Sequence, residues 1–274
     1  MLKVIMNTNY KIFNAAEYWQ RETSLPSIPT FCQQVDKLLG SDGVQLGTIT
    51  ELLGLPGTGK TQMCLQLCAS IQIPKALGGL EAEALYIDTN TNFRIHRYQG
   101  HLIPEILKSC LLKCQKLLDT SEVIDEKEAL KRLHYVGAFG VVEFGALMHM
   151  LPTYLRDRPK IRLVVIDSIA FPFKEGVSAR ERSGLLFRQM AELQRCAVER
   201  QIAVVLTNEM STRLGLSGGS IVGSMGDAWS HRGNVRLLLS STERGRAAVL
   251  VKSNVAGAGV ASFQITKEGI RDVE

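Results

Sequence analysis

The sequence predicts an α/β protein with a mostly parallel, twisted sheet flanked by helices. From Gly47 onward, apolar strand-like segments alternate with longer segments of helical periodicity, as in parallel sheets with crossover helices. Two of the strand-like segments, LVVID and AVVLT, are continuous apolar runs rich in β-branched residues, as expected of strands covered on both faces. A glycine-rich loop between the strand-like segment 48–53 and the helix after it is the third indication.

The expected elements divide the chain into a lead-in and a core. Residues 1–45 hold a short tether helix in FNAAEYWQRE, a proline-bearing linker and a second helix that ends at Gly40. Because only about 45 residues precede the core, no full N-terminal helical domain is expected. The core, residues 46–274, is expected to contain strands over 48–53, 84–88, 161–167 and 202–207 and helices over 62–73, 102–118, 143–156 and 179–200.

Three further strand-like segments lie near 235–239, 247–252 and 261–265. They alternate between apolar and polar residues and are joined by short polar links, which is typical of hairpin pairing. We therefore expect an antiparallel edge toward the C-terminus.

Composition sets limits on function. The 274 residues are 45% apolar and 22% charged, which is typical of a soluble globular chain with one substantial core. The net charge of +5 is compatible with a nucleic-acid partner and also common in proteins without one. No apolar run approaches the roughly 20 residues of a membrane helix, so no membrane partner is expected. The N-terminus lacks signal-peptide features and none of the six cysteines forms C-x-x-C, which favours an intracellular protein with buried thiols over a zinc site.

The segment GLPGTGKT satisfies the G-x-x-x-x-G-K-[ST] pattern of a phosphate-binding loop, with a strand before it and a helix after it. Its glycines let the backbone curve so that successive N–H groups point at phosphates. In such loops the lysine reaches the β- and γ-phosphates and the final hydroxyl binds Mg²⁺. The candidate ATP-binding residues are Gly54, Leu55, Pro56, Gly57, Thr58, Gly59, Lys60 and Thr61.

Asp167 ends the buried strand RLVVID. A carboxylate there is costly unless it faces a cation or a metal-bound water, so Asp167 is predicted as the second Mg²⁺ element beside Thr61. The alternative is a capped surface aspartate after a strand. ATP and Mg²⁺ are the cofactors that these residues imply.

Two classes of phosphate-loop protein do not fit. GTPases read guanine through N-K-x-D, and here Asn208 is followed by Glu209. The segment LGLSGGS looks like an ABC signature but follows Asp167 instead of preceding it, and Ser168 stands where ABC and AAA-type ATPases place a glutamate. The glycine- and serine-rich segment LSGGSIVGSMGD is expected to be a mobile loop.

The remaining class places its general-base glutamate in a segment D-T-E-x-x-F-R, and residues 88–94 read DTNTNFR. With TFCQQVDKLLG, GLPGTGKTQMCLQL, LVVIDSIAFPF, VVLTNEM, WSHRGNVRL and FQITKEGIRD in this order, the chain resembles the RecA-type recombinases of eukaryotes over almost its whole length. TFC, IAFPF and W-x-H are most similar to the C-type paralogue of that family. The resemblance implies a RecA-like core and a role in homologous recombination, double-strand break repair and meiotic recombination. It also implies a nuclear location, with other recombinase paralogues, the main recombinase and single-stranded or branched DNA as partners.

The resemblance also assigns residues. Phe13 and Ala16 match an F-x-x-A tether between protomers, and Arg97 matches an arginine that stacks on adenine. His231 matches a residue that couples nucleotide to DNA loops, although a histidine beside a strand is otherwise more often structural. Residues 172–184 and 211–228 match two mobile loops that approach DNA. The basic candidates for DNA phosphates are Lys174, Arg180, Arg182 and Arg213. The alternative for the first loop is a solvated helix face, because Glu175 and Glu181 are interleaved.

Two catalytic positions depart from the family pattern. Asn90 stands in the general-base position, and an amide cannot take a proton from water. Glu209 stands where the family has a glutamine that senses the γ-phosphate. Either Glu209 is the base of a DNA-dependent ATPase, or it faces the γ-phosphate as a like charge and turnover is largely lost. We favour the second, because a sensing position is not placed for in-line attack. A small-molecule phosphotransferase is a further alternative, with residues 178–188 as its lid.

Overall fold

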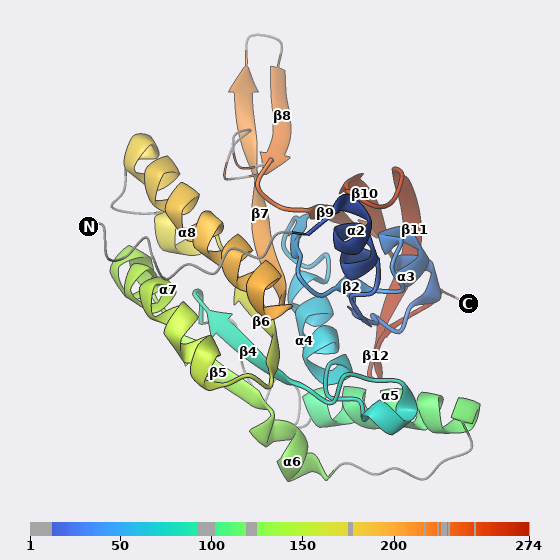
Figure 1. Ribbon diagram of the computed structural model, residues 1–274. Coiled ribbons are helices and arrows are strands. Elements are labelled where there is room, and N and C mark those ends of the chain that lie inside the picture. The colour runs from blue at the N-terminus through green and yellow to red at the C-terminus, as the bar shows by residue number, and fades with distance from the viewer. Residues whose placement is uncertain are drawn as a thin grey trace, which may run out of the picture.

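The computed structural model describes residues 13–91, 102–118, 125–174, 178–215, 218–223, 225, 229, 231–243 and 245–273. A ten-stranded sheet in the order β12-β11-β10-β9-β3-β7-β6-β4-β5, with β8 paired to β7, runs through the molecule (Figure 1). Its strands are β3 (Ile49–Gly54), β4 (Glu83–Asp88), β5 (Leu133–Gly137), β6 (Ile161–Asp167), β7 (Ala203–Gly215), β8 (Gly218–Gly223), β9 (Val235–Thr242), β10 (Gly245–Lys252), β11 (Gly259–Thr266) and β12 (Gly269–Arg271).

The pairing confirms the predicted fold class. β5, β4, β6, β7, β3 and β9 are parallel neighbours in turn, whereas β9, β10, β11 and β12 pair antiparallel. The antiparallel edge therefore lies toward the C-terminus, as the alternating polarity of those segments indicated.

Helices cover both faces of the sheet. They are α2 (Ala15–Thr23), α3 (Gln33–Leu39), α4 (Lys60–Ser70), α5 (Leu102–Leu118), α6 (Glu126–Lys131), α7 (Gly140–Asp157) and α8 (Ala179–Arg200), with 3-10 turns η1 (Lys75–Leu77) and η2 (Phe171–Phe173). Successive strand residues point to opposite faces. Ala84 and Tyr86 of β4 thus join the core with α3, α4 and α5, while Leu85 and Ile87 join the core with α7 and α8.

The lead-in helices have different surroundings. α2 begins with a capping box between Asn14 and Glu17 and has no buried residue. α3 ends at Gly40, as expected, and contributes Val35 and Leu39 to the core, while β1 (Ser27–Ile28) pairs with β2 (Val44–Gln45). The division into a lead-in and a core at residue 46 stays a prediction.

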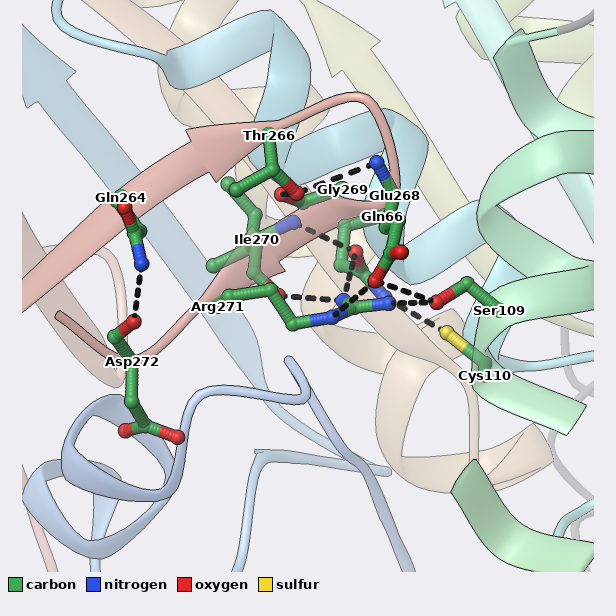
Figure 2. Close-up of polar contacts among 10 residues, drawn as sticks. All are labelled: Gln66, Ser109, Cys110, Gln264, Thr266, Glu268, Gly269, Ile270, Arg271 and Asp272. Carbon is green, nitrogen blue, oxygen red and sulfur yellow. Dashed lines mark hydrogen bonds and ion pairs between the residues drawn. The ribbon is translucent and has the colours of Figure 1, made fainter. Parts of the chain in front are cut away.

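The C-terminal strand is fixed by polar contacts to two helices (Figure 2). The Ile270 amide donates to Gln66 Oε1 of α4 at 2.9 Å, and Arg271 donates to Ser109 Oγ of α5 at 2.7 Å. One residue later, the Asp272 carboxylate accepts from the amides of Gln33 and Gln34 at the start of α3, both at 3.1 Å. These contacts tie residues 270–272 to α4, α5 and α3, three helices distant in sequence.

Several sequence expectations require correction. Residues 211–215 and 218–223 are not a loop: β7 continues to Gly215 and pairs antiparallel with β8, forming the hairpin that projects beyond the sheet in Figure 1. The β-branched Thr212, Ile221 and Val222 favour strands, and glycines had obscured that pattern. β5, α6 and β12 were missed because each is short. Residues 178–188 are the N-cap and first half of α8, in which Leu186 is buried, and their role as a lid stays a prediction.

No helix in the described part of the chain is long and apolar enough to cross a membrane. All six cysteines are free, and all except the partly exposed Cys114 are buried. Among the described residues, no group of three or more histidines, cysteines and acidic residues is placed to hold a metal.

Candidate nucleotide site

The phosphate loop joins the end of β3 to the start of α4. Gly54 is enclosed there, because a Cβ at this residue would lie 2.5 Å from the Leu239 carbonyl oxygen and 2.6 Å from Thr58 Oγ1. Gly59 caps α4 with φ of 105°, a conformation that favours glycine. The loop therefore depends on glycine at both positions for its path into the helix N-terminus, where backbone N–H groups are free for an anion.

The Lys60 side chain folds over the loop. Its Nζ donates to the carbonyl oxygens of Gly54 at 2.7 Å and Leu55 at 3.0 Å. Burial lowers the pKa of Lys60, while the carboxylates of Asp167 and Glu209 act in the opposite direction. The ammonium group is thus held beside the loop and within the electrostatic influence of two acidic residues.

Asp167 is buried and accepts three side-chain hydrogen bonds. Thr61 donates to Oδ2 at 2.8 Å and Tyr86 donates to the same atom at 2.7 Å, while Thr207 donates to Oδ1. These donors come from α4, β4 and β7, so the carboxylate joins three elements. The structure therefore brings together Thr61 and Asp167, the two residues expected to hold Mg²⁺. Tyr86 and Thr207 were not anticipated, because neither follows a motif.

Asn90 lies just beyond the tip of β4. Its backbone N–H donates to Asp88 Oδ1 at 3.0 Å, and Thr89 fixes the turn by donating through Oγ1 to the Ser168 carbonyl at 2.7 Å. Because Asp88 and Asp167 are register partners in neighbouring parallel strands, Asn90 lies at the same edge of the sheet as the predicted Mg²⁺ residues. The general-base position is thus near the loop, but an amide occupies it.

Glu209 lies on β7 opposite Gly54, its Cα register partner on β3. Its Oε2 forms an ion pair with Lys174 Nζ at 2.6 Å, and that ammonium group is also 4.7 Å from the centre of the Phe171 ring. The expectation of an uncompensated carboxylate facing the γ-phosphate is therefore incomplete, because a cation already holds Glu209. Lys174, which the sequence suggested as a contact to DNA, is thus the ion-pair partner of Glu209 in this structure.

A further acidic residue, Glu51, is buried on β3, three residues before the loop begins at Gly54. Its Oε1 accepts from Asn208 Nδ2 and Trp229 Nε1, both at 2.7 Å, and its Oε2 accepts from Arg236 Nε at 2.7 Å. Asn208 immediately precedes Glu209, and Trp229 lies two residues before His231. We call these four residues the Glu51 network. It connects β3 to β7 through Asn208, to the chain before β9 through Trp229, and to β9 through Arg236.

The other sequence candidates are placed as follows. His231 is exposed, and its carbonyl accepts from Lys252 Nζ at 3.1 Å. Arg182 is half-buried on α8, whereas the side chains of Arg180 on α8 and Arg213 on β7 lie outside the described part, as does all of Arg97.

The predicted tether residues lie at the start of α2. Ala16 is exposed, and the ring of Phe13 lies 5.3 Å from the guanidinium of Arg21. Both side chains are exposed, Phe13 just before the N-cap Asn14 and Ala16 in the first turn of α2. Their role in assembly stays a prediction.

Arg246 of β10 is a residue that sequence patterns did not single out. It donates to the Gly57 carbonyl oxygen at 3.5 Å, and its stem packs near Gly59. Its Nε is buried without a hydrogen-bond partner. Such an orphaned donor beside the loop, like the buried and unpartnered Ser168 Oγ beside Asp167, indicates a region suited to a polar ligand.

Comparison with known proteins gives the family. The Rad51 family profile matches residues 20–273. The chain is 33% identical to DNA repair protein RAD51 homolog 3 of Cricetulus griseus, over 96% of this chain and 73% of that protein, and 31% identical to the Dictyostelium discoideum homolog 3, over 90% and 66%. It is 32% identical to DNA repair and recombination protein RadA of Metallosphaera sedula, over 95% and 76%. The chain thus spans about two thirds to three quarters of these relatives, and the resemblance to the C-type paralogue is confirmed. The chain belongs to the Rad51 family.

Proposed function

We propose that this protein binds ATP with Mg²⁺ and holds it as part of a recombinase-paralogue complex in DNA repair. The observation that carries the proposal is the contact between the Thr61 hydroxyl and the Asp167 carboxylate, with Lys60 folded beside them over the loop. The backbone N–H groups of the loop and Lys60 would hold the phosphates, and Thr61 and Asp167 would hold the metal. The unpartnered Ser168 Oγ adds a polar group at the same place. Bound Mg²⁺ would supply charge neutralisation of the phosphates.

Hydrolysis is expected to be weak. The amide of Asn90 cannot accept the proton of an attacking water, and loss of a general base typically costs about 10²–10⁴-fold in rate. Glu209 is the alternative base, but its carboxylate is already engaged by Lys174 in an ion pair at 2.6 Å, which restrains its position. Both features favour a protein that is held in one state by ATP over one that cycles rapidly.

The role in repair rests on the relatives, which are named as DNA repair or recombination proteins. We therefore assign this chain to homologous recombination and double-strand break repair in the nucleus, with meiotic recombination as a further setting. Its partners would be other RecA-type paralogues and the main recombinase, on single-stranded or branched DNA. Phe13 and Ala16, just before and within the first turn of a helix that buries no residue, would engage the neighbouring protomer.

Equilibrium binding of a fluorescent ATP analogue tests the nucleotide part of the proposal. Wild type should bind it in a Mg²⁺-dependent manner, and Lys60→Ala should lose at least about tenfold in affinity, because a charge-assisted contact to phosphate is removed. Lys131→Ala is the matched control, because this lysine lies on α6 in an exposed ion pair. Binding that is unchanged by Lys60→Ala would contradict the proposed site.

A further inference from the structure

Glu209 and Lys60 both neighbour Gly54, the residue at which the loop leaves β3. The Cα of Glu209 pairs with the Cα of Gly54, and Lys60 Nζ donates to the Gly54 carbonyl at 2.7 Å. The Lys60 amine, which is expected to contact the terminal phosphates, is therefore hydrogen-bonded to Gly54, the residue that pairs with Glu209 across the two strands. A terminal phosphate that reaches Lys60 approaches Glu209 as well.

A free carboxylate at this position would repel a triphosphate more than a diphosphate, because the added charge of the longer ligand lies at its end. The structure compensates that charge with Lys174, whose ammonium group is 2.6 Å from Glu209 Oε2. Lys174 follows η2, which itself follows Asp167 closely in sequence. The pair thus joins the end of β6, which carries a predicted Mg²⁺ residue, to the sensor strand β7.

The ion pair between Lys174 and Glu209 is more enclosed than a fully exposed surface pair. The side chain of Glu209 is 29% exposed and that of Lys174 is 45% exposed, so the carboxylate is the more enclosed partner. Lys174 also lies against the Phe171 ring at 4.7 Å, which favours a cation there. The position of the lysine is therefore set by two neighbours.

From this arrangement we infer that Lys174 is a positioning residue for the nucleotide: it holds and neutralises Glu209 so that the site accepts a nucleoside triphosphate in preference to a diphosphate. The inference rests on the proposed nucleotide site. It assigns Lys174 to discrimination at the terminal phosphate and leaves contact with DNA to other basic residues.

Calorimetric titration with ATPγS and with ADP, both with Mg²⁺, tests the inference. Lys174→Gln should weaken ATPγS by about tenfold, the effect of one uncompensated and partly screened charge, and change ADP by less than about twofold. Lys174→Arg should keep the wild-type ratio. Lys174→Gln combined with Glu209→Gln should restore the ratio to within about twofold, because the repelling charge is then absent. If Lys174 only stabilised the fold, removing the Glu209 charge as well would not restore the ATPγS-to-ADP ratio.

Lys131→Gln with Glu128→Gln provides the control, since that pair also has an N···O distance of 2.6 Å but lies on α6. An equal loss for both nucleotides in Lys174→Gln, or no loss, would overturn the inference while leaving nucleotide binding intact. Weaker binding of an oligonucleotide with an unchanged ATPγS-to-ADP ratio would return Lys174 to the DNA surface. Wild type that binds neither nucleotide would refute the proposed site itself.

Discussion

Replacing Glu51 with alanine removes the acceptor for three side chains at once. The Glu51 side chain is 2% exposed and that of its ion-pair partner Arg236 is 12% exposed, so the substitution leaves a nearly buried guanidinium uncompensated. Asn208 and Trp229 lose their 2.7 Å contacts in the same step. Breaking a buried pair by removing one partner costs about 3–5 kcal/mol in the free energy of unfolding.

Urea unfolding followed by tryptophan emission measures this loss. With an m-value of about 3 kcal/mol/M for a chain of this size, the midpoint should fall by roughly 1–1.7 M. Trp229 is 5% exposed and should shift its emission to longer wavelength, and Trp19→Phe provides the background that isolates it. Glu51→Gln keeps an acceptor oxygen but loses the charge, so it should lose about half as much.

The exposed residue Glu128 supplies the control, because Glu128→Ala should leave the midpoint unchanged. Arg236→Ala and the double variant complete a cycle, in which the double variant should lose less than the sum of the single losses. A loss below about 1 kcal/mol for Glu51→Ala, the value of an exposed pair, would refute the account of a buried and energetically coupled network.

Three further predictions concern titration, the loop and the tether. Burial raises the pKa of Asp36 from 3.8 to about 6, so the folded protein binds a proton between these values that the unfolded chain has released. The stability contribution of this residue should therefore be present below about pH 4 and lost as pH rises through 6, and comparison with Asp36→Asn across that range should show no such dependence on pH in the variant. Gly54→Ala should lower the melting temperature and abolish binding of the ATP analogue, because the added Cβ would lie 2.5 Å from the Leu239 carbonyl; unchanged binding would mean that the loop can move aside. Phe13→Glu should reduce capture of a partner recombinase in a pull-down without changing the melting temperature, because α2 buries no residue against the core; undiminished capture would exclude the tether.

The sequence alone was enough to predict those parts of the fold that a short contiguous segment encodes. Residues 54–61 form a contiguous motif, and Asp167 ends a run of apolar residues, so both could be located without coordinates. β5 could not, because LHYVG is short and partly polar and becomes a strand by pairing with β4. The β7–β8 hairpin was misread because its glycines resemble those of a loop, although its pairing runs from Met210 to Gly223.

The polar contacts around the loop were beyond prediction for a different reason. Glu51, Asn208 and Arg236 meet only because β7 and β9 both pair with β3, and no spacing in the sequence indicates that order. The pair between Lys174 and Glu209 likewise depends on where η2 leaves the sheet. Because of this ion pair, Glu209 is a compensated negative charge and not the isolated one that the sequence suggested.

The fate of bound ATP in a single-turnover experiment tests the central claim most directly. Protein in excess over radiolabelled ATP and Mg²⁺ would be quenched at intervals, with and without single-stranded DNA, and the bound nucleotide separated. The account predicts that wild type retains ATP, while Asn90→Glu, which restores a carboxylate at the tip of β4, converts it to ADP at least about 10²-fold faster. Rapid conversion by wild type that Glu209→Gln abolishes would contradict the account, because Glu209 would then be the working base.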